Sequence, residues 1–167
     1  MLFLKEMNIE DAKKEYIAMT SIPEDENGFV NKFYNVSFEE FVNEVIPTCE
    51  KQSKGIDLKP NRVPQNYYFL WDDDEIVGLF KVRKKLNDSL REGAGHIGYG
   101  IIKKYRKRGY AIRGLKLVIE LIKDEIEEDE IYMSVNKNNP YSLKTQLNCG
   151  VYIFNENEDH YFTRIKI

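Results

Sequence analysis

The chain has 167 residues, of which 42% are apolar and 32% are charged. A chain of this length buries about 70% of the surface that it exposes when unfolded, so a single domain over residues 1–167 needs neither disulfides nor metal for its core. The formal net charge of −3 does not call for a nucleic-acid partner, and no run of apolar residues approaches the length of a membrane span.

Two cysteines and the N-terminal residues indicate the compartment. Neither Cys49 nor Cys149 belongs to a Cys-x-x-Cys pair or has a histidine pair nearby, so we expect neither a disulfide nor a metal site. The apolar run at residues 1–4 is too short for the apolar region of a signal peptide. These features predict a cytoplasmic protein.

The first 28 residues predict a strand, a helix and a loop. Residues 2–6 are expected to form the strand, and Asn8 is expected to cap a helix over about residues 9–19. Asp11, three residues after Asn8, supports that cap. Residues 21–28 contain a proline and three acids, and they predict a polar loop.

A capping box predicts the second helix. Ser37 and Glu40 have the spacing at which each side chain satisfies a backbone N–H of the other. The helix is expected to end near Ile46, because Pro47 disfavours its continuation. Residues 52–65, with one glycine and two prolines, predict a connecting loop.

Three strands and a third helix follow. Residues 67–71 and 76–82 are expected to be strands that flank an acidic hairpin turn at residues 72–75. After a polar loop, residues 95–103 predict another strand. The helix is expected over residues 111–123, where apolar side chains recur at the spacing of one helical face, namely Ala111, Leu115, Val118, Ile119 and Ile122.

The last part of the chain predicts a strand at residues 131–135, a short helix at 140–148, and closing strands at 151–154 and 161–167. There are no repeats, no low-complexity tract and no interdomain linker. The order β-α-α-β-β-β-α-β-α-β-β predicts a mixed α/β domain.

The segment from Gly95 to Ala111 carries the strongest chemical signal. A strand leads into a basic turn at residues 103–108, and Gly109 then precedes a helix. The first backbone N–H groups of a helix have no intrahelical partner, and its N-terminus carries a partial positive charge. Gly109 lets the backbone approach a bound oxygen closely. These features together predict an anion-binding site, and pyrophosphate is the ligand that suits it best.

Other interpretations of this segment stay open. The basic turn is alternatively a solvated surface or a nucleic-acid patch. Such a patch would normally add interleaved aromatic residues and a wider basic stripe, and only Tyr105 and Tyr110 accompany the turn. Gly98 and Gly100 indicate either a bulge in the strand or a close approach of a ligand to the backbone.

Two motifs connect the chain with a known family. Residues 106–111, Arg-Lys-Arg-Gly-Tyr-Ala, fit Arg/Gln-x-x-Gly-x-Gly/Ala, the acetyl-CoA signature of the GNAT N-acetyltransferases. Residues 139–142, Asn-Pro-Tyr-Ser, are similar to the Asn-x-x-Ser of that family's next motif. The chain resembles the GNAT family in element order throughout and in local detail over residues 67–150. Residues 86–88 with residues 95–99 also resemble a bacterial subgroup of predicted acetyltransferases. The resemblance implies the GNAT acyl-CoA N-acyltransferase fold.

The same resemblance implies acetyl-CoA as co-substrate and a set of residues that bind it. Backbone groups around Tyr99 would pair with the pantetheine arm like an added strand, N–H groups of residues 107–112 would hold the pyrophosphate, and residues 139 and 142 would line the far side. Plain helix capping is the alternative for the last two. The expected binding residues are Ile101, Ile102, Arg106, Lys107, Arg108, Gly109, Tyr110, Ala111, Ile112, Asn139 and Ser142.

The implied reaction is the transfer of acetyl from acetyl-CoA to a primary amine of a small molecule or peptide by direct attack. We expect no metal, no nucleic-acid or membrane partner, and a monomer or homodimer. Two departures from the family pattern are Lys107, where many relatives place another glycine, and Gln146, where many carry a tyrosine that protonates the departing thiolate. Because glutamine is no such acid, a catalytically weak CoA-binding module is the alternative function.

His96, Glu92 and Tyr99 are the candidate catalytic residues. His96 opens the strand beside the expected pantetheine arm, and a histidine, with an ordinary pKa of about 6.5, suits a general base at neutral pH. A structural role is the alternative for His96. Glu92 and Asp88, in the preceding loop, are either solvated acids or carboxylates that hold the amine. Tyr99 is a packing residue, a contact to the pantetheine arm or an acid.

Overall fold

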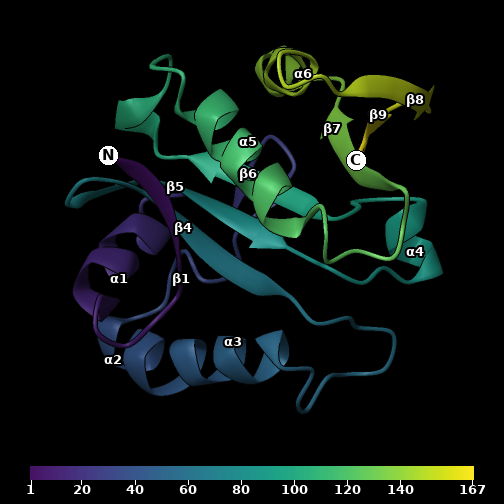
Figure 1. The fold of residues 1–167 in the computed structure, drawn as a ribbon. Helices are drawn as coiled ribbons and strands as arrows, with labels where there is room; N and C mark the ends of the chain where they lie inside the picture. Colours follow the sequence, from purple (N-terminus) through teal and green to yellow (C-terminus); the bar gives the residue numbers. More distant parts are fainter.

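A four-stranded antiparallel sheet lies at the centre of the computed structural model, which describes residues 1–167 (Figure 1). Its strands stand in the order β1 (Leu2–Glu6), β4 (Asn66–Asp72), β5 (Glu75–Val82) and β6 (Ile97–Ile101). β4 and β5 form the predicted hairpin, with Asp72 opposite Glu75. β6 is the last strand on its side, so its outer edge has no partner within this sheet.

A second, three-stranded antiparallel sheet contains β7 (Glu130–Asn136), β9 (His160–Lys166) and β8 (Tyr152–Glu156), in that order. It joins the first sheet where Gly95 bridges to Met133 and the His96 N–H donates to the Tyr132 carbonyl at 2.7 Å. Gly95 has a φ of +68°, and a Cβ at this position would collide with the Tyr132 carbonyl, so the junction requires glycine. Beyond the junction β6 and β7 are no longer paired, and the two sheets separate.

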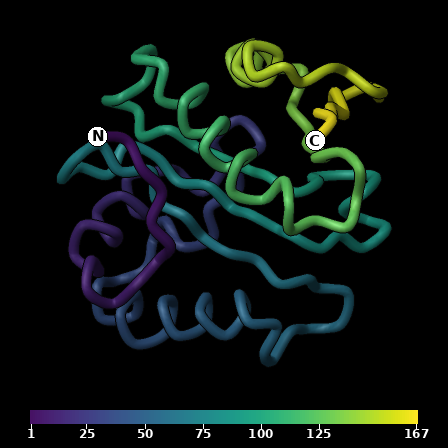
Figure 2. Tube along the Cα trace, viewed as in Figure 1, coloured from purple at the N-terminus to yellow at the C-terminus, as the bar shows by residue number.

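Helices cover both faces of the first sheet, as Figure 2 shows along the chain trace. One face carries α1 (Ala12–Thr20), α2 (Phe38–Glu40), the π-helical turn η1 (Phe41–Val45) and α3 (Ile46–Ser53). The other carries α5 (Tyr110–Ile122), and α6 (Pro140–Leu147) lies between α5 and the second sheet. Fully buried side chains of Phe69, Phe80, Leu79 and Leu115 join these layers, each contributing about 1.5–3 kcal/mol by burial.

The predicted order of strands and helices is confirmed, with short additions in three places between the expected elements. Within residues 21–30 lies a small hairpin of β2 (Asp25–Glu26) and β3 (Phe29–Val30), whose turn is Asn27-Gly28 with φ values of +53° and +93°. Asparagine followed by glycine suits such left-handed hairpin turns. The other additions are α4 (Asp88–Arg91) and a 3₁₀ turn, η2 (Lys103–Tyr105).

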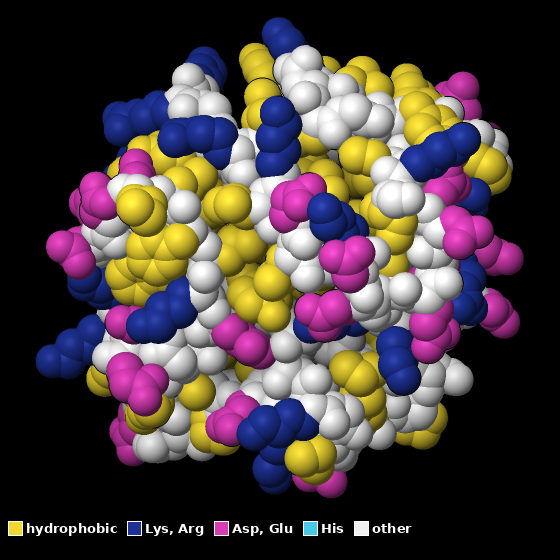
Figure 3. Space-filling model, in the orientation of Figure 1, with side chains coloured by type: hydrophobic (Ala, Val, Ile, Leu, Met, Phe, Trp, Pro, Cys, Tyr) yellow, Lys and Arg dark blue, Asp and Glu magenta, His cyan; other side chains and the backbone are white.

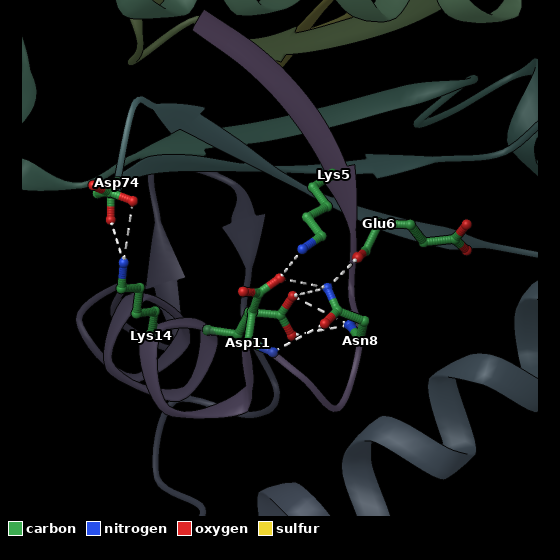
Figure 4. A network of polar contacts seen from close by, with 7 residues as sticks. Lys5, Glu6, Asn8, Asp11, Lys14 and Asp74 are labelled. Carbon is green, nitrogen blue, oxygen red and sulfur yellow. Dashed lines mark hydrogen bonds and ion pairs between the residues drawn. The ribbon is translucent and has the colours of Figure 1, made fainter. Parts of the chain in front are cut away.

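Helix α1 begins at Ala12, later than expected, because Asn8 caps an isolated turn ahead of it (Figure 4). The Asn8 side-chain oxygen accepts from the Asp11 N–H at 2.9 Å, and its amide donates to the carboxylates of Asp11 and Glu15 at 3.0 and 3.1 Å. The Asn8 N–H in turn donates to Glu15 at 3.1 Å. Burial raises the pKa of Glu15 to about 8.

The prediction that Pro47 ends the second helix is wrong. The capping box itself is present, since Ser37 Oγ accepts from the Glu40 N–H at 3.1 Å and the Glu40 carboxylate accepts from the Ser37 N–H at 2.7 Å. The π-helical turn then bonds the Ile46 N–H to the Phe41 carbonyl and shifts the register. Pro47 consequently stands in the first turn of α3, where a missing N–H leaves no gap in the hydrogen bonding.

No helix in the structure combines the length and the apolar character that a membrane crossing requires. Three or more His, Cys, Asp or Glu side chains nowhere gather in a group that could hold a metal ion. Cys49 and Cys149 are both free thiols, and burial raises the pKa of Cys49 to about 12.

Candidate active site

A cleft of about 560 Å³ opens where β6 and β7 separate, between the end of β6, the turn before α5, and α6. Ten of the residues singled out in the sequence line it. They come from two separate stretches of the sequence, residues 99–112 and 139–142, which the fold brings to one cleft. The ten are Tyr99, Ile101, Arg106, Lys107, Gly109, Tyr110, Ala111, Ile112, Asn139 and Ser142.

The start of α5 forms a cradle of free backbone donors on one wall of the cleft. Gly109 is the N-cap with a φ of +76°, and Lys107 is held at a φ of +63°. The first N–H within the helix to find a backbone acceptor is that of Arg113, which donates to the Gly109 carbonyl at 3.1 Å. The N–H groups of residues 110–112 therefore remain available to an anion.

Basic side chains surround this cradle. Figure 3 shows Lys and Arg side chains gathered over the turn between β6 and α5, at the upper left of the view. A Cβ on Gly109 would meet no atom within 4 Å, so the space in front of the cradle is open. Unpaired N–H groups, positive charge and open space suit the diphosphate of CoA, and this part of the site fits that ligand.

Arg106, the first residue of the signature, has a structural task as well as a place in the cleft wall. Its Nε donates to the Ile101 carbonyl at 3.0 Å, and its guanidinium pairs with Glu26 at 2.8 Å. The β2–β3 hairpin is thereby tied to the end of β6. Glu26, which the sequence analysis did not single out, is brought to the edge of the cleft.

Two of the expected binding residues do not line the cleft. Ile102 is buried, and its N–H donates to the Val77 carbonyl at 3.0 Å, so its backbone is already used within the core. Arg108 is exposed in the turn, with its guanidinium 5.9 Å from the centre of the Tyr105 ring. It contributes charge near the cradle rather than a wall of the cleft.

A second hollow, of about 250 Å³, adjoins the cleft on the side of β5 and β7. Glu26, Asn139, Tyr99 and Ser142 border both, so the two spaces meet at these residues. The second hollow is also lined by Lys81 and Arg83, from the end of β5, and by His160, from the start of β9. None of these three side chains is among the predicted site residues.

Tyr99 and Ser142 form a hydroxyl pair at the meeting point. The Tyr99 oxygen lies 2.8 Å from Ser142 Oγ, and the Tyr99 ring stacks on Phe80 at 5.5 Å between centroids. Burial raises the pKa of Tyr99 to about 12, so the phenol keeps its proton at neutral pH. Asn139 caps α6 by accepting from the Ser142 N–H at 3.1 Å, which shows that capping and lining the cleft are compatible.

His96 lies away from both hollows and is fully buried. Its Nε2 is 3.0 Å from Glu128, and its Nδ1 accepts from the Tyr132 N–H at 2.9 Å. Glu128 is also held by Arg91 at 3.0 Å. With both ring nitrogens engaged at the junction of the two sheets, His96 has no nitrogen free for an amine, so this geometry favours the structural alternative.

Glu92 and Asp88 also lie apart from the site. Glu92 is exposed and borders a different hollow, of about 180 Å³, beside Arg91 and β9. Asp88 is exposed and pairs with Arg91 at 3.4 Å. Among the carboxylates of the chain, Glu26 alone borders the cleft or the second hollow.

Replacing His96 with alanine is expected to lower the free energy of unfolding by about 3 kcal/mol, because the change leaves a cavity, an unpaired Tyr132 N–H and a Glu128 carboxylate that keeps only Arg91. Burial lowers the pKa of His96, while the hydrogen bond to Glu128 acts in the opposite direction. The unfolded chain therefore takes up a proton below about pH 6.5 while the folded chain still excludes it, so wild-type stability falls as the pH drops below that value.

Urea unfolding at neutral and mildly acidic pH measures both effects. The His96→Ala variant should lose less stability than the wild type on acidification, because it lacks the titrating ring. A variant as stable as the wild type would refute the structural role.

Gln146 is buried in the body of the protein and does not reach the cleft. Its side-chain oxygen accepts from the Thr163 hydroxyl at 2.5 Å, and its amide nitrogen lies 3.5 Å from the Ser134 carbonyl. Gln146 thus fastens α6 to the second sheet.

A family model described as "Acetyltransferase (GNAT) domain" matches residues 2–151. The search of curated proteins found no match.

Solved structures resemble this one along almost the whole chain. Ribosomal-protein-S5-alanine acetyltransferase from Vibrio fischeri superposes with a TM-score of 0.71 at 16% identity, over 99% of this chain and 92% of that one. The microcin C7 self-immunity acetyltransferase MccE, in complex with acetyl-CoA and AMP, gives 0.72 at 14% identity, over 99% and 92%. Spermidine N-acetyltransferase from Vibrio cholerae, in complex with CoA and spermine, gives 0.64 at 15%, over 99% and 95%. At these identities the likeness establishes the fold.

Proposed function

Because the chain belongs to the GNAT acetyltransferase family, we propose that it transfers the acetyl group of acetyl-CoA to a primary amine. One observation carries the proposal: a cleft with a free backbone cradle meets a second hollow at a hydroxyl pair and a carboxylate. The cleft would hold the donor, and the second hollow would hold the acceptor. The acetyl group would lie where the two spaces meet.

Donor binding would rest on backbone groups of two elements. The free N–H groups of residues 110–112 would bind the diphosphate, with Lys107 adding positive charge. The outer edge of β6 has no partner strand beyond the junction at Gly95, so it offers backbone groups to the amide-bearing pantetheine arm. Bound acetyl-CoA supplies an activated thioester whose carbonyl carbon accepts the amine.

Glu26 is the proposed general base. A primary amine has an ordinary pKa of about 10, so it has to lose a proton before it can attack. The Glu26 carboxylate borders both spaces, and only one of its oxygens pairs with Arg106. Glu26 would take one proton from the ammonium form before the attack. As the nitrogen–carbon bond forms and the carbon–sulfur bond breaks, the nitrogen would lose a second proton to solvent.

The Tyr99–Ser142 pair is the proposed proton donor to the departing sulfur. Both side chains border the cleft, and the phenol stays protonated at neutral pH because its pKa is raised. Exchange with solvent then returns the proton gained by Glu26 to the hydroxyl pair. This assignment gives the reaction an acid although residue 146 is a glutamine.

Two measurements test the proposal. Acetyl-CoA at 100 times its dissociation constant should raise the free energy of unfolding by about 2.7 kcal/mol, which a thermal-shift titration detects. A panel of amines with detection of the released thiol should then give turnover. The absence of any shift at millimolar acetyl-CoA would contradict the proposal, and binding without thiol release from any amine would favour the CoA-binding module instead.

A further inference from the structure

Two cationic side chains project to the second hollow from one segment of the first sheet. Lys81 lies on β5, and Arg83 follows one residue after the strand ends. Residues two apart on an extended segment point to the same side. Both side chains are partly buried, and both border the hollow next to the proposed position of the acetyl group.

Neither cation is paired with a carboxylate. The Lys81 ammonium contacts the Val30 carbonyl and lies 4.6 Å from the centre of the Phe29 ring, and the Arg83 guanidinium donates to the Gly95 carbonyl at 3.2 Å. The one carboxylate that borders the hollow, Glu26, is paired with Arg106 instead. Each cation therefore keeps donor capacity for a ligand.

Further cationic side chains lie near Lys81 and Arg83. Burial lowers the pKa of Lys81 to about 8, with Arg83 and Lys32 adding to the effect. Burial also lowers the pKa of Arg83, and Arg62 acts in the same direction. Partly desolvated cations without a counter-ion are unfavourable, and a bound anion would relieve that free energy.

We propose that the acceptor is a small amine that also carries a carboxylate or phosphate, and that Lys81 and Arg83 bind this anionic group. The inference rests on the proposed function, in which the second hollow holds the acceptor. The planar guanidinium of Arg83 suits a two-oxygen anion, and the Lys81 ammonium adds a point charge. With its anionic group bound there, the acceptor would point the amine at its other end toward Glu26.

A polyamine does not suit this hollow. Its additional ammonium groups would meet Lys81 and Arg83, and like charges at short range repel. The volume of about 250 Å³ also limits the acceptor to a small molecule or to the terminal residue of a longer one. In this respect the chain would differ from the spermidine enzyme that shares its fold.

Calorimetric titration in the presence of saturating CoA tests the proposal without requiring turnover, because CoA occupies the phosphate cradle. The probes are matched pairs: alanylalanine against its C-terminal amide, and 2-aminoethyl phosphate against ethanolamine, with spermidine as the cationic probe. The anionic member of at least one pair should bind about tenfold or more tightly than its neutral partner. The pair that shows the preference distinguishes a carboxylate from a phosphate.

Arg83→Met should remove most of this preference, and Arg83→Lys should restore part of it. Lys85→Met, which removes an exposed cation without an ion-pair partner, is the matched control and should keep the preference. Lys81→Met provides a second test should Arg83→Met fail to fold. Equal binding within both pairs, or tighter binding of spermidine, would overturn the proposal. A loss of CoA binding itself would contradict the proposed function, and the Arg83 variants would still decide whether the hollow prefers anions.

Discussion

Glu26→Gln is expected to lower kcat by about 10²-fold or more, the typical contribution of a general base. The amide has nearly the size of the carboxylate, and its oxygen can still accept from Arg106, whose guanidinium now lies 2.8 Å from Glu26. The β2–β3 hairpin should therefore stay in place while the base is lost. Thiol release measured against pH should show a loss of rate together with a changed profile, whereas a positioning role would leave the profile unchanged.

Glu24→Gln is the matched control for this experiment. Glu24 is exposed in the same loop and borders neither the cleft nor the second hollow, so the same change of charge should leave kcat within about twofold. His160 borders the second hollow and is the competing base. Retention of rate and profile in Glu26→Gln, together with their loss in His160→Asn, would transfer the role to the histidine.

Gly109→Val is expected to weaken acetyl-CoA binding by about 10²-fold, which corresponds to the loss of two charge-assisted hydrogen bonds. The φ of +76° at Gly109 is strongly unfavourable for a β-branched residue, so the backbone should turn away from this conformation. The N–H groups of residues 110–112 would then no longer converge on the diphosphate. Calorimetry with acetyl-CoA measures the loss, and circular dichroism shows whether the fold is kept.

Gly109→Asn separates backbone conformation from crowding, because asparagine tolerates the left-handed region. No atom lies within 4 Å of a Cβ at this position, so neither variant meets a clash in the free protein. We expect Asn to retain more affinity than Val. Binding of acetyl-CoA to the Val variant at wild-type strength would place the phosphate site elsewhere.

Local patterns were sufficient for most of the regular elements and for the glycine-led start of α5. The acidic turn at residues 72–75 and the apolar spacing of α5 are signals that a few neighbouring residues carry, and the structure confirms both. The cradle is also local, since the turn and the helix that form it are continuous in sequence. The prediction at Pro47 was wrong because a π-helical turn precedes it and places the proline in the first turn of α3. No simple sequence pattern indicates such a turn.

The remainder of the candidate site depends on contacts between distant segments. Glu26, Lys81 and His160 come from a hairpin, a central strand and the last strand, and only the fold brings them to one hollow. The Asn27-Gly28 turn was a readable hairpin signal, yet it could not have shown that Glu26 faces Arg106. The same limit explains the prediction for His96. Its partner Glu128 is 32 positions away in the sequence, so the sequence did not reveal that the ring nitrogen is already bonded.

The junction at Gly95 leaves the two sheets unpaired along the remainder of β6 and β7. The C-terminal sheet is joined to the rest by the bridge and the His96 contacts beside it, by core side chains such as Ile131 and Met133, and through α6, which contacts β6 at the Tyr99–Ser142 pair. A donor arm lying along the β6 edge would fill the place of the missing strand. Bound donor would then contact both sheets and strengthen the link between them. That link would weaken again each time the spent donor leaves.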